Sequence, residues 1–299
     1  MKSPRITVIG SSNTDLVITA ARLPQPGETL LGGEFCRFHG GKGANQAVAA
    51  ARAGGRVSFI GAHGEDDFGR AAKAALRAEG IDVSAFRAKS GKSSGIALIV
   101  LGGRERQNQI VVARSANDAI SPTDVDLARN KITRAGIVVA QLEIPLESVT
   151  RAAAIAAKAG VPFLLNPAPA RRLPSTLLRL VHTLVPNEHE AGLLTGESSP
   201  EKAAQALLRR GCRQIVVTLG ARGALCVTAK GSKLVRAPRV KPVDTVGAGD
   251  CFTGWLAVGL AEGLSLEEAV RRSVSASALK VTRHGAQSGL PYRSEVKMQ

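Results

Sequence analysis

The sequence predicts an α/β fold, in which a doubly wound and mostly parallel sheet is flanked by helices and carries a small β-sheet lid. Short apolar strand patterns alternate with helical patterns, most regularly from residue 122 onward, and this alternation is typical of a parallel sheet. Two strand-like segments, about 15–39 and 95–114, are not followed by helices of their own and are expected to form the lid. The hydrophobic content of 44% is sufficient for one core, so residues 1–299 are expected to form a single domain.

Composition excludes several classes of protein. The net charge is +16, but Lys and Arg are scattered from Lys2 to Lys297, which indicates a basic surface that attracts small anions. Aromatic residues make up only 3% of the chain, so a nucleic-acid partner is not expected. The four cysteines lack CxxC spacing and the five histidines are isolated, which favours a reduced cytoplasmic protein without a zinc site. No signal peptide and no apolar run of membrane-spanning length is recognised.

The first predicted strand, residues 6–9, ends at Gly10 and is followed by Asn13, Thr14 and Asp15. The carboxyl ends of strands are where open α/β sheets bind ligands, and the Asn and Asp side chains suit a polyol. An Asx turn explains the same residues, and for so short a motif it is the better interpretation.

A glycine-rich segment, residues 40–45 (GGKGAN), precedes an Ala-rich helix expected over residues 46–53. Its glycines permit close approach of the backbone to a ligand, and Lys42 and Asn45 add hydrogen-bond donors. The segment is not a Walker A loop, because Gly43 stands where Ser or Thr should follow the lysine.

The next segments predict a strand at 57–61, a helix at 67–79 and a hairpin of residues 95–101 and 109–113. This hairpin turns at Gly102-Gly103 and is expected to pair with segment 15–39. A closing lid of this kind would exclude water from a site beneath it.

Regular alternation follows, with helices expected at 122–135 and 146–159 and strands at 137–142 and 161–165. Glu143 ends the first of these strands at the carboxyl edge of the sheet. After residues 181–186, the spacing of Asn187 and Glu190 places both side chains on one helical face, where they are suited to hold water around a magnesium ion. A capping box explains the same spacing, and from spacing alone it is the better interpretation.

The C-terminal third predicts strands at 215–219, 225–228 and 234–237 and helices at 251–260 and 266–280. Two glycines, Gly220 and Gly223, follow the first of these strands, where they either pass beneath a nucleotide or form a tight turn. Glycines before the helix at 251–260 leave N–H groups free at a helix start, which attracts phosphate oxygens. Asp250 beside them suits a base that removes a proton from an attacking hydroxyl. A glycine-rich turn that opens a buried helix is the alternative.

Several stretches resemble the PfkB carbohydrate kinases across nearly the whole chain. They are 40–50 (GGKGANQAVAA), 141–143 (QLE), 166–170 (NPAPA), 186–190 (PNEHE), 218–220 (TLG) and 244–250 (DTVGAGD). Within the family, the first and third are most similar to the kinases of ribose. The resemblance implies ATP-dependent phosphorylation of D-ribose at the 5-hydroxyl, giving ribose 5-phosphate and ADP, with Asp250 as general base.

The same resemblance implies a role for each matched residue. The anion hole would consist of the backbone of Gly247, Ala248 and Gly249. The sugar would contact Asn13, Thr14, Asp15, Gly41, Lys42, Gly43, Ala44, Asn45, Glu143 and Asp250. ATP would contact Asn187, Thr218, Leu219, Gly220, Ala221, Arg222, Gly223, Gly249 and Asp250. Glu190 would help to organise Mg²⁺ indirectly, and a monovalent cation, K⁺, would lie near Asp244, Val246, Lys280, Arg283, Gly285 and Gly289.

Three positions depart from the family pattern. Lys280 replaces a small residue, Gly289 replaces a serine, and Val274 stands where some members place a histidine near the adenine. The resemblance also implies a homodimer formed through the lid, because exposed strand edges favour a partner.

The sequence is compatible with two other kinds of function. A PfkB kinase for another sugar (2-deoxyribose or fructose) or a nucleoside is the first alternative, although Glu143 and the scarcity of aromatic residues argue against a nucleoside. A non-catalytic sugar sensor or a basic nucleic-acid-binding protein is the second, and Asp250 with its neighbouring glycines argues against a silent protein.

Overall fold

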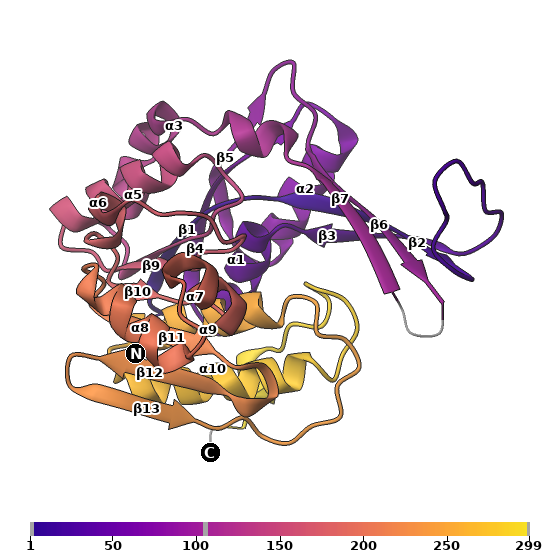
Figure 1. Ribbon diagram of the computed structural model, residues 1–299. Helices are drawn as coiled ribbons and strands as arrows, with labels where there is room; N and C mark the ends of the chain where they lie inside the picture. Colours follow the sequence, from indigo (N-terminus) through magenta and orange to yellow (C-terminus); the bar gives the residue numbers. More distant parts are fainter. Residues whose placement is uncertain (1–2, 104–106, 298–299) are drawn as a thin grey trace.

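The computed structural model describes residues 3–103 and 107–297, and two sheets organise this part of the chain (Figure 1). The larger sheet has the strand order β13-β12-β11-β10-β9-β8-β1-β4-β5. Its strands are β1 (Arg5–Ile9), β4 (Arg56–Gly64), β5 (Asp82–Lys89), β8 (Ile137–Ala140), β9 (Phe163–Leu165), β10 (Thr183–Leu184), β11 (Gln214–Thr218), β12 (Ala224–Thr228) and β13 (Gly231–Val235). Every pairing from β5 to β11 is parallel, and only β12 and β13 are antiparallel. The predicted doubly wound, mostly parallel sheet is confirmed.

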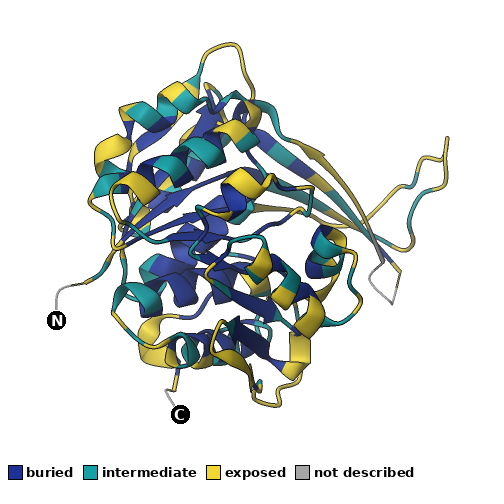
Figure 2. Cartoon of the chain, turned by 60° about the vertical axis from the view of Figure 1, so that its left-hand side comes forward, coloured by how far each residue is buried: buried dark blue, intermediate teal, exposed yellow. Residues whose placement is uncertain are grey.

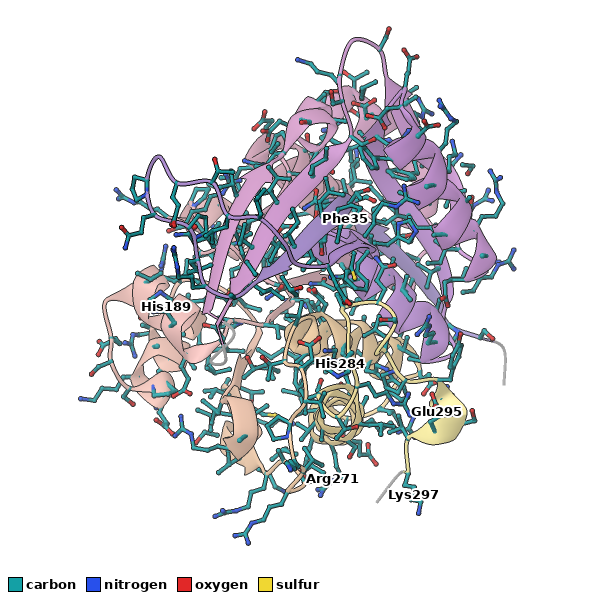
Figure 3. All side chains as sticks on the ribbon, turned by 90° about the vertical axis from the view of Figure 1, so that its right-hand side faces the viewer. Phe35, His189, Arg271, His284, Glu295 and Lys297 are labelled. Carbon is teal, nitrogen blue, oxygen red and sulfur yellow. The ribbon has the colours of Figure 1, made fainter. Side chains whose placement is uncertain are left out.

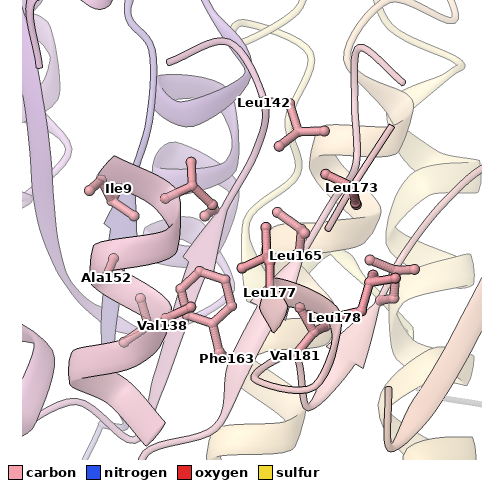
Figure 4. Close-up of a cluster of buried hydrophobic side chains, with 14 of the residues drawn as sticks. Ile9, Val138, Leu142, Ala152, Phe163, Leu165, Leu173, Leu177, Leu178 and Val181 are labelled. Carbon is pink, nitrogen blue, oxygen red and sulfur yellow. The ribbon is translucent and has the colours of Figure 1, made fainter. Parts of the chain in front are cut away.

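Helices cover both faces of this sheet, and each face has its own hydrophobic core. One core includes α1 (Lys42–Arg52), α2 (Asp67–Ala78), α9 (Ala248–Ala261) and α10 (Leu266–Lys280). The other includes α3 (Pro122–Leu127), α4 (Arg129–Thr133), α5 (Leu146–Lys158), α6 (Ser175–Leu178), α7 (Glu188–Thr195) and α8 (Pro200–Arg209). In the second core, Val138 of β8 and Phe163 of β9 pack beneath Ala152 of α5, with Leu177 of α6 nearby (Figure 4). All four residues of β8 are buried, as expected for a strand covered on both faces.

The second sheet is the predicted lid. It contains β2 (Asn13–Ala20), β3 (Phe35–Gly40), β6 (Gly95–Gly102) and β7 (Gln107–Ala113) in the order β3-β2-β6-β7. The two excursions therefore pair as expected, with Asn13 of β2 opposite Gly95 of β6. The lid projects from the body (Figure 1), and most of its residues are exposed or intermediate, in contrast to the buried central strands (Figure 2). The part of the predicted excursion at residues 104–106 lies outside the described residues.

Two helices begin earlier than predicted. The helix α1 starts at Lys42 instead of residue 46, and α9 starts at Ala248 instead of residue 251. In both cases the residue before the helix is a glycine with positive φ, 86° at Gly41 and 76° at Gly247. Glycine adopts this conformation readily, so the chain turns directly into the helix. The polar residues after each glycine consequently lie in a first helical turn.

Other boundaries also differ from the prediction. The helix expected at 122–135 is divided at Ala128, whose φ of −101° and ψ of 10° are not helical. The last strand of the larger sheet is Gly231–Val235 instead of 234–237. The elements β5, α6 and α8 were not predicted. Among the described residues, none of the helices has both the length and the apolar character needed to span a membrane.

Candidate active site

Asp250 lies in the first turn of α9, and only 7% of it is exposed. Two side-chain amides of α1 hold its carboxylate: Asn45 Nδ2 donates to Oδ2 and Gln46 Nε2 donates to Oδ1, each at 2.9 Å. Burial raises the pKa of Asp250, against the opposing effects of Lys42 and of the two amides. A raised pKa makes the carboxylate a better proton acceptor near neutral pH, which is what a general base requires.

Gln46 is a site residue that the sequence did not indicate. Its Nε2 also donates to Asn166 Oδ1 at 3.0 Å, and its Oε1 accepts from Gln141 Nε2 at 2.6 Å. This chain of amides fixes which end of Gln46 faces Asp250. Gln141 and Asn166 follow β8 and β9 in the chain, so the ends of two neighbouring strands support the base.

The turn before α9 presents free amides to solvent. The N–H of Ala248 donates to Thr245 O at 3.2 Å, whereas the N–H groups of Gly247, Gly249 and Asp250 donate no hydrogen bond within the described structure. A Cβ added at Gly249 would meet no atom within 4 Å, so this turn borders open space. Free N–H groups at a helix start are suited to bind an anion. Of the three residues predicted to form the anion hole, Gly247 and Gly249 therefore contribute free N–H groups, and the N–H of Asp250 is a third.

Lys42 lies between the predicted sugar site and Asp250. Burial lowers its pKa, but the carboxylates of Asp250, Glu143 and Glu190 outweigh this effect and the pKa is raised. The N–H of Lys42 donates to Glu143 Oε2 at 3.0 Å, and Ser11 Oγ donates to the same oxygen at 2.5 Å. Lys42 therefore remains an ammonium that balances a group of carboxylates.

Asp15 completes the carboxylate group. Burial, followed by the negative charges of Glu143 and Asp250, raises its pKa to about 6. Asp15 lies on β2 of the lid, whereas Glu143 follows β8 of the body, so the site is formed by both sheets. Oxygen acceptors grouped around a lysine suit a ligand rich in hydroxyl groups.

Asn13 is oriented by a residue that the sequence did not indicate. Asn117 Nδ2 donates to Asn13 Oδ1 at 2.8 Å, and Asn117 Oδ1 accepts from Ser12 N at 3.0 Å. Because the Oδ1 of Asn13 is engaged, its NH₂ group is the end left for a ligand. Asn117 lies 104 residues away in a short 3₁₀ turn (Ser115–Ala119), and no sequence pattern connects the two.

Four other residues predicted to contact the sugar have packing roles in the structure. A Cβ at Gly41 would lie 2.7 Å from Asn13 N, and one at Gly43 would lie 2.6 Å from Ser11 N. Ala44 and Thr14 are only 1% and 2% exposed. The glycines therefore allow α1 to approach the protein's own backbone between β1 and β2. Direct contact of these four residues with a sugar stays a prediction.

Two cavities meet at the turn before α9, and both are lined by Thr218 and Gly249. The smaller, about 210 Å³, contains Asp250 and Lys42 together with Asn187 and Glu190. The larger, about 600 Å³, is a mostly apolar cleft. It is lined by the predicted residues Gly220, Ala221 and Gly223, and by Val274, the position that departs from the family pattern. Residues that were not predicted also line it: Ala237, Pro238, Arg239, Val240, Pro242, Phe252, Ser277, Ala278 and Val281.

Of the residues predicted at the nucleotide, Asn187 and Asp250 line only the smaller cavity, and Arg222 and Leu219 line neither. Arg222 forms an ion pair with Glu188 at the surface. Leu219 is buried beneath the turn and is 7% exposed. A cleft of this size with apolar walls is suited to a purine base, and the free amides at its end are suited to phosphates.

The structure contains the predicted capping box of Asn187 and Glu190, and their role at a magnesium ion stays a prediction. They form a capping box, in which Glu190 N donates to Asn187 Oδ1 at 2.8 Å and Asn187 N donates to Glu190 Oε2 at 2.9 Å. They also line the smaller cavity, and burial raises the pKa of Glu190. Within residues 3–103 and 107–297, no group of three or more His, Cys, Asp or Glu side chains is arranged to hold a metal ion. The protein would therefore contribute to a magnesium site through few groups, with water and phosphate as the other ligands.

The loop predicted to hold a monovalent cation contains a buried lysine. The carboxylate of Asp244 accepts N–H groups from Val246 at 2.9 Å and from Gly285 at 2.8 Å. Lys280 is 0% exposed, and its Nζ donates to the carbonyl oxygen of Asp244 at 2.8 Å. Burial lowers the pKa of Lys280, and the negative charge of Asp244 opposes this effect.

The family profile described as pfkB family carbohydrate kinase matches residues 3–293. The chain belongs to the PfkB family of carbohydrate kinases.

Individual relatives cover almost the whole chain. The ribokinase of Haemophilus influenzae is 42% identical over 296 residues, covering 97% of this chain and 96% of the relative. The deoxyribokinase of Salmonella typhi is 37% identical, covering 96% and 95%. Among solved structures, the Arabidopsis thaliana ribokinase complexed with ribose and ATP has a TM-score of 0.93 at 33% identity, covering 99% of this chain and 98% of that one. The PfkB chain described here thus shares its fold with a structure that contains both ribose and ATP.

Proposed function

We propose that this protein is a ribokinase, which transfers the γ-phosphoryl group of ATP to the 5-hydroxyl of D-ribose and releases ribose 5-phosphate and ADP. The observation that carries this proposal is the position of Asp250 in the smaller cavity, beside Lys42 and next to the cleft suited to a nucleotide. The similarity to ribokinases from several organisms, one of them solved with ribose and ATP, supports the choice of substrates.

The proposed reaction assigns one step to each group. The carboxylate of Asp250 takes the proton of the 5-hydroxyl as its oxygen forms a bond to the γ-phosphorus. The bond between that phosphorus and the bridging oxygen breaks, and ADP leaves with the electron pair. The free N–H groups of Gly247, Gly249 and Asp250 stabilise the negative charge of the transferring group, and the positive end of α9 adds to their effect.

The sugar would be held between the lid and the body. Asp15 and Glu143 would accept hydrogen bonds from ribose hydroxyls, and Asn13 and Asn45 would donate to them. Because Asp15 belongs to the lid, movement of the lid toward the body would complete the site and exclude water from it.

Magnesium is part of this proposal. Glu190, with one carboxylate oxygen free of the capping box, and Asn187 fit a site in which water lies between protein and ion. When bound with ATP, Mg²⁺ neutralises charge on the phosphates. The loop predicted to hold K⁺ has a different arrangement, because the buried Lys280 donates a hydrogen bond to Asp244 O.

A homodimer formed through the lid is also proposed. Residues on one face of a strand alternate, so Leu98 of β6 and Val111, its partner on β7, lie on the face opposite Asp15. Ile18 and its partner Phe35, which is labelled in Figure 3, share this outer face. All four side chains are at least 45% exposed. An exposed apolar surface of this kind is typical of a protein interface. We further propose a cytoplasmic location, where ATP is available and the four free cysteines stay reduced.

A sugar panel tests the substrate. ADP release would be measured with D-ribose, 2-deoxyribose, fructose and adenosine under identical conditions. We expect the highest kcat/KM with ribose. Turnover with 2-deoxyribose that equals or exceeds the rate with ribose would favour the activity for which the Salmonella typhi relative is named. Absence of turnover with any sugar would favour a non-catalytic sugar sensor.

A further inference from the structure

A fully buried lysine lies behind the anion-binding turn. Lys280 is the last residue of α10, and its hydrogen bond to the Asp244 carbonyl places a positive charge inside the protein. A buried charge is tolerated only when it is paired and hydrogen-bonded. The carboxylate of Asp244 and the negative end of α10 provide this compensation.

Lys280 is connected to the catalytic turn through Asp244. The carboxylate of Asp244 accepts the N–H of Val246, the residue before Gly247, which caps α9. From the other side, Ser277 Oγ of α10 donates to Ala248 O at 3.0 Å. The end of α10 therefore fixes the turn that presents the free N–H groups. His284, labelled in Figure 3, marks the loop that follows α10.

Three of the six residues predicted at a potassium ion, Asp244, Lys280 and Gly285, already use their oxygens as hydrogen-bond acceptors within the protein. Both carboxylate oxygens of Asp244 accept N–H groups. The carbonyl of Lys280 accepts from Arg283 N at 2.9 Å, and that of Gly285 accepts from Gly289 N at 3.3 Å.

Position 289 provides no side-chain oxygen, and the surrounding backbone leaves no space for one. A Cβ at Gly289 would lie 2.8 Å from Gly285 O and 3.1 Å from His284 O. A second cation would also be repelled by the ammonium of Lys280. The loop of this chain therefore does not fit a potassium ion.

We propose that the ε-ammonium of Lys280 supplies, from within the chain, the positive charge that a monovalent cation would otherwise supply to the anion-binding turn. Turnover is then independent of added monovalent cations. Lys280 is a positioning residue, because it acts through the Asp244 peptide and lines neither cavity. The activity readout of this inference depends on the proposed kinase function.

The wild-type protein gives the first test. Turnover with the best sugar of the panel would be compared in KCl, NaCl and choline chloride at equal ionic strength, which keeps general screening constant. We expect rates within about twofold of one another. Activation by KCl of more than about fivefold over choline chloride would overturn the proposal.

Thermal unfolding in the same salts gives a readout without turnover. We expect no increase in the Tm of the wild-type protein that is specific to KCl, because no potassium ion binds. A specific increase would contradict the inference even if ribose were not the substrate. Absence of turnover with every sugar, together with equal Tm values, would contradict only the proposed function.

Two substitutions at Lys280 separate charge from volume. Lys280→Ala should lower turnover on the order of tenfold in choline chloride, and KCl or NH₄Cl should restore part of it, because a free cation enters the vacated space. Lys280→Met retains the volume without the charge, so its turnover should be low in every salt. The matched control is Lys158→Ala, at the exposed end of α5, which should behave like the wild type. A folded Lys280→Ala with wild-type turnover in choline chloride would show that the charge has no role.

Discussion

At the scale of single residues, the site depends on how each charge is held. Asp250 is buried, yet each of its carboxylate oxygens accepts a hydrogen bond from a side-chain amide. The amides orient the carboxylate and lower its pKa, but burial outweighs their effect, so the pKa stays raised. Lys42 supplies the compensating positive charge from the first turn of α1. The same group of charges determines the titration of Asp15.

The raised pKa of Asp15 predicts a pH dependence of sugar binding. The folded protein holds a proton on Asp15 below a pH of about 6, and the carboxylate forms above it. If ribose requires the carboxylate, its Kd should increase as pH falls through 6, by up to about tenfold for each unit below that value. Calorimetric titration without ATP measures this, with Asp15→Asn as the comparison. A wild-type Kd that is constant between pH 7 and 5 would show that Asp15 does not bind the sugar in its charged form.

At the scale of elements, the position of α1 and α9 determines the site, because each brings its first turn to Asp250. Gly43 is in close contact with the backbone of Gly10 and Ser11, whereas Gly249 faces open space. Gly43 therefore permits close packing of the backbone, whereas Gly249 leaves space for a ligand, although both lie in the first turn of a helix.

A matched pair of alanine substitutions tests this difference. Gly43→Ala should lower the free energy of unfolding by about 1–3 kcal/mol, because the added Cβ overlaps backbone that cannot move aside. Gly249→Ala should leave stability unchanged or slightly higher, but should lower turnover because the methyl group enters the space for phosphate. Urea unfolding and steady-state kinetics of both variants measure these effects. Equal losses of stability in the two would contradict the assignment.

The sequence predicted the fold more completely than the details of the site. Buried runs such as residues 6–9 and 137–140 identify central strands, because a strand covered on both faces is apolar throughout. Strand β5 was missed because Ser84 and Arg87 interrupt its apolar pattern. The early starts of α1 and α9 depend on glycines with positive φ, and sequence alone does not show this conformation.

Within the site, the sequence indicated the residues that would carry the chemistry better than those that position them. Gln46 lies in the family motif 40–50 but was not predicted as a site residue, and Asn117 lies outside every motif. They act on Asp250 and Asn13 across 204 and 104 residues of sequence, and such contacts arise only when the helices and turns meet in the folded chain. The contact of Lys280 with Asp244 was missed for the same reason, although its departure from the family pattern was visible.

At the scale of the whole molecule, the lid connects the sugar site to the proposed dimer. Its inner face carries Asp15, and its outer face carries the exposed apolar group of Ile18, Phe35, Leu98 and Val111. A partner on the outer face would bury this group and stabilise the lid. Sugar binding and dimer formation would then depend on the same four strands.

The substitution Leu98→Glu tests the dimer, because it places a charge in the centre of the apolar group. We expect the wild-type protein to have a dimeric mass in sedimentation equilibrium at micromolar concentration, and the variant to have a monomeric mass. Lys158→Ala, remote from the lid, is the control and should remain dimeric. A monomeric wild-type protein would contradict the proposed interface.

The central claim is that Asp250 takes the proton of the sugar hydroxyl, and Asp250→Asn tests it most directly. Asparagine retains the shape and its one amide oxygen can keep one of the two hydrogen bonds from Asn45 and Gln46, but it cannot act as the base. We predict that ribose-dependent ADP release falls on the order of a hundredfold to ten-thousandfold, while the Tm and the Kd for ATP stay close to those of the wild type. Ribose-dependent ADP release at the wild-type rate in this variant would contradict the claim.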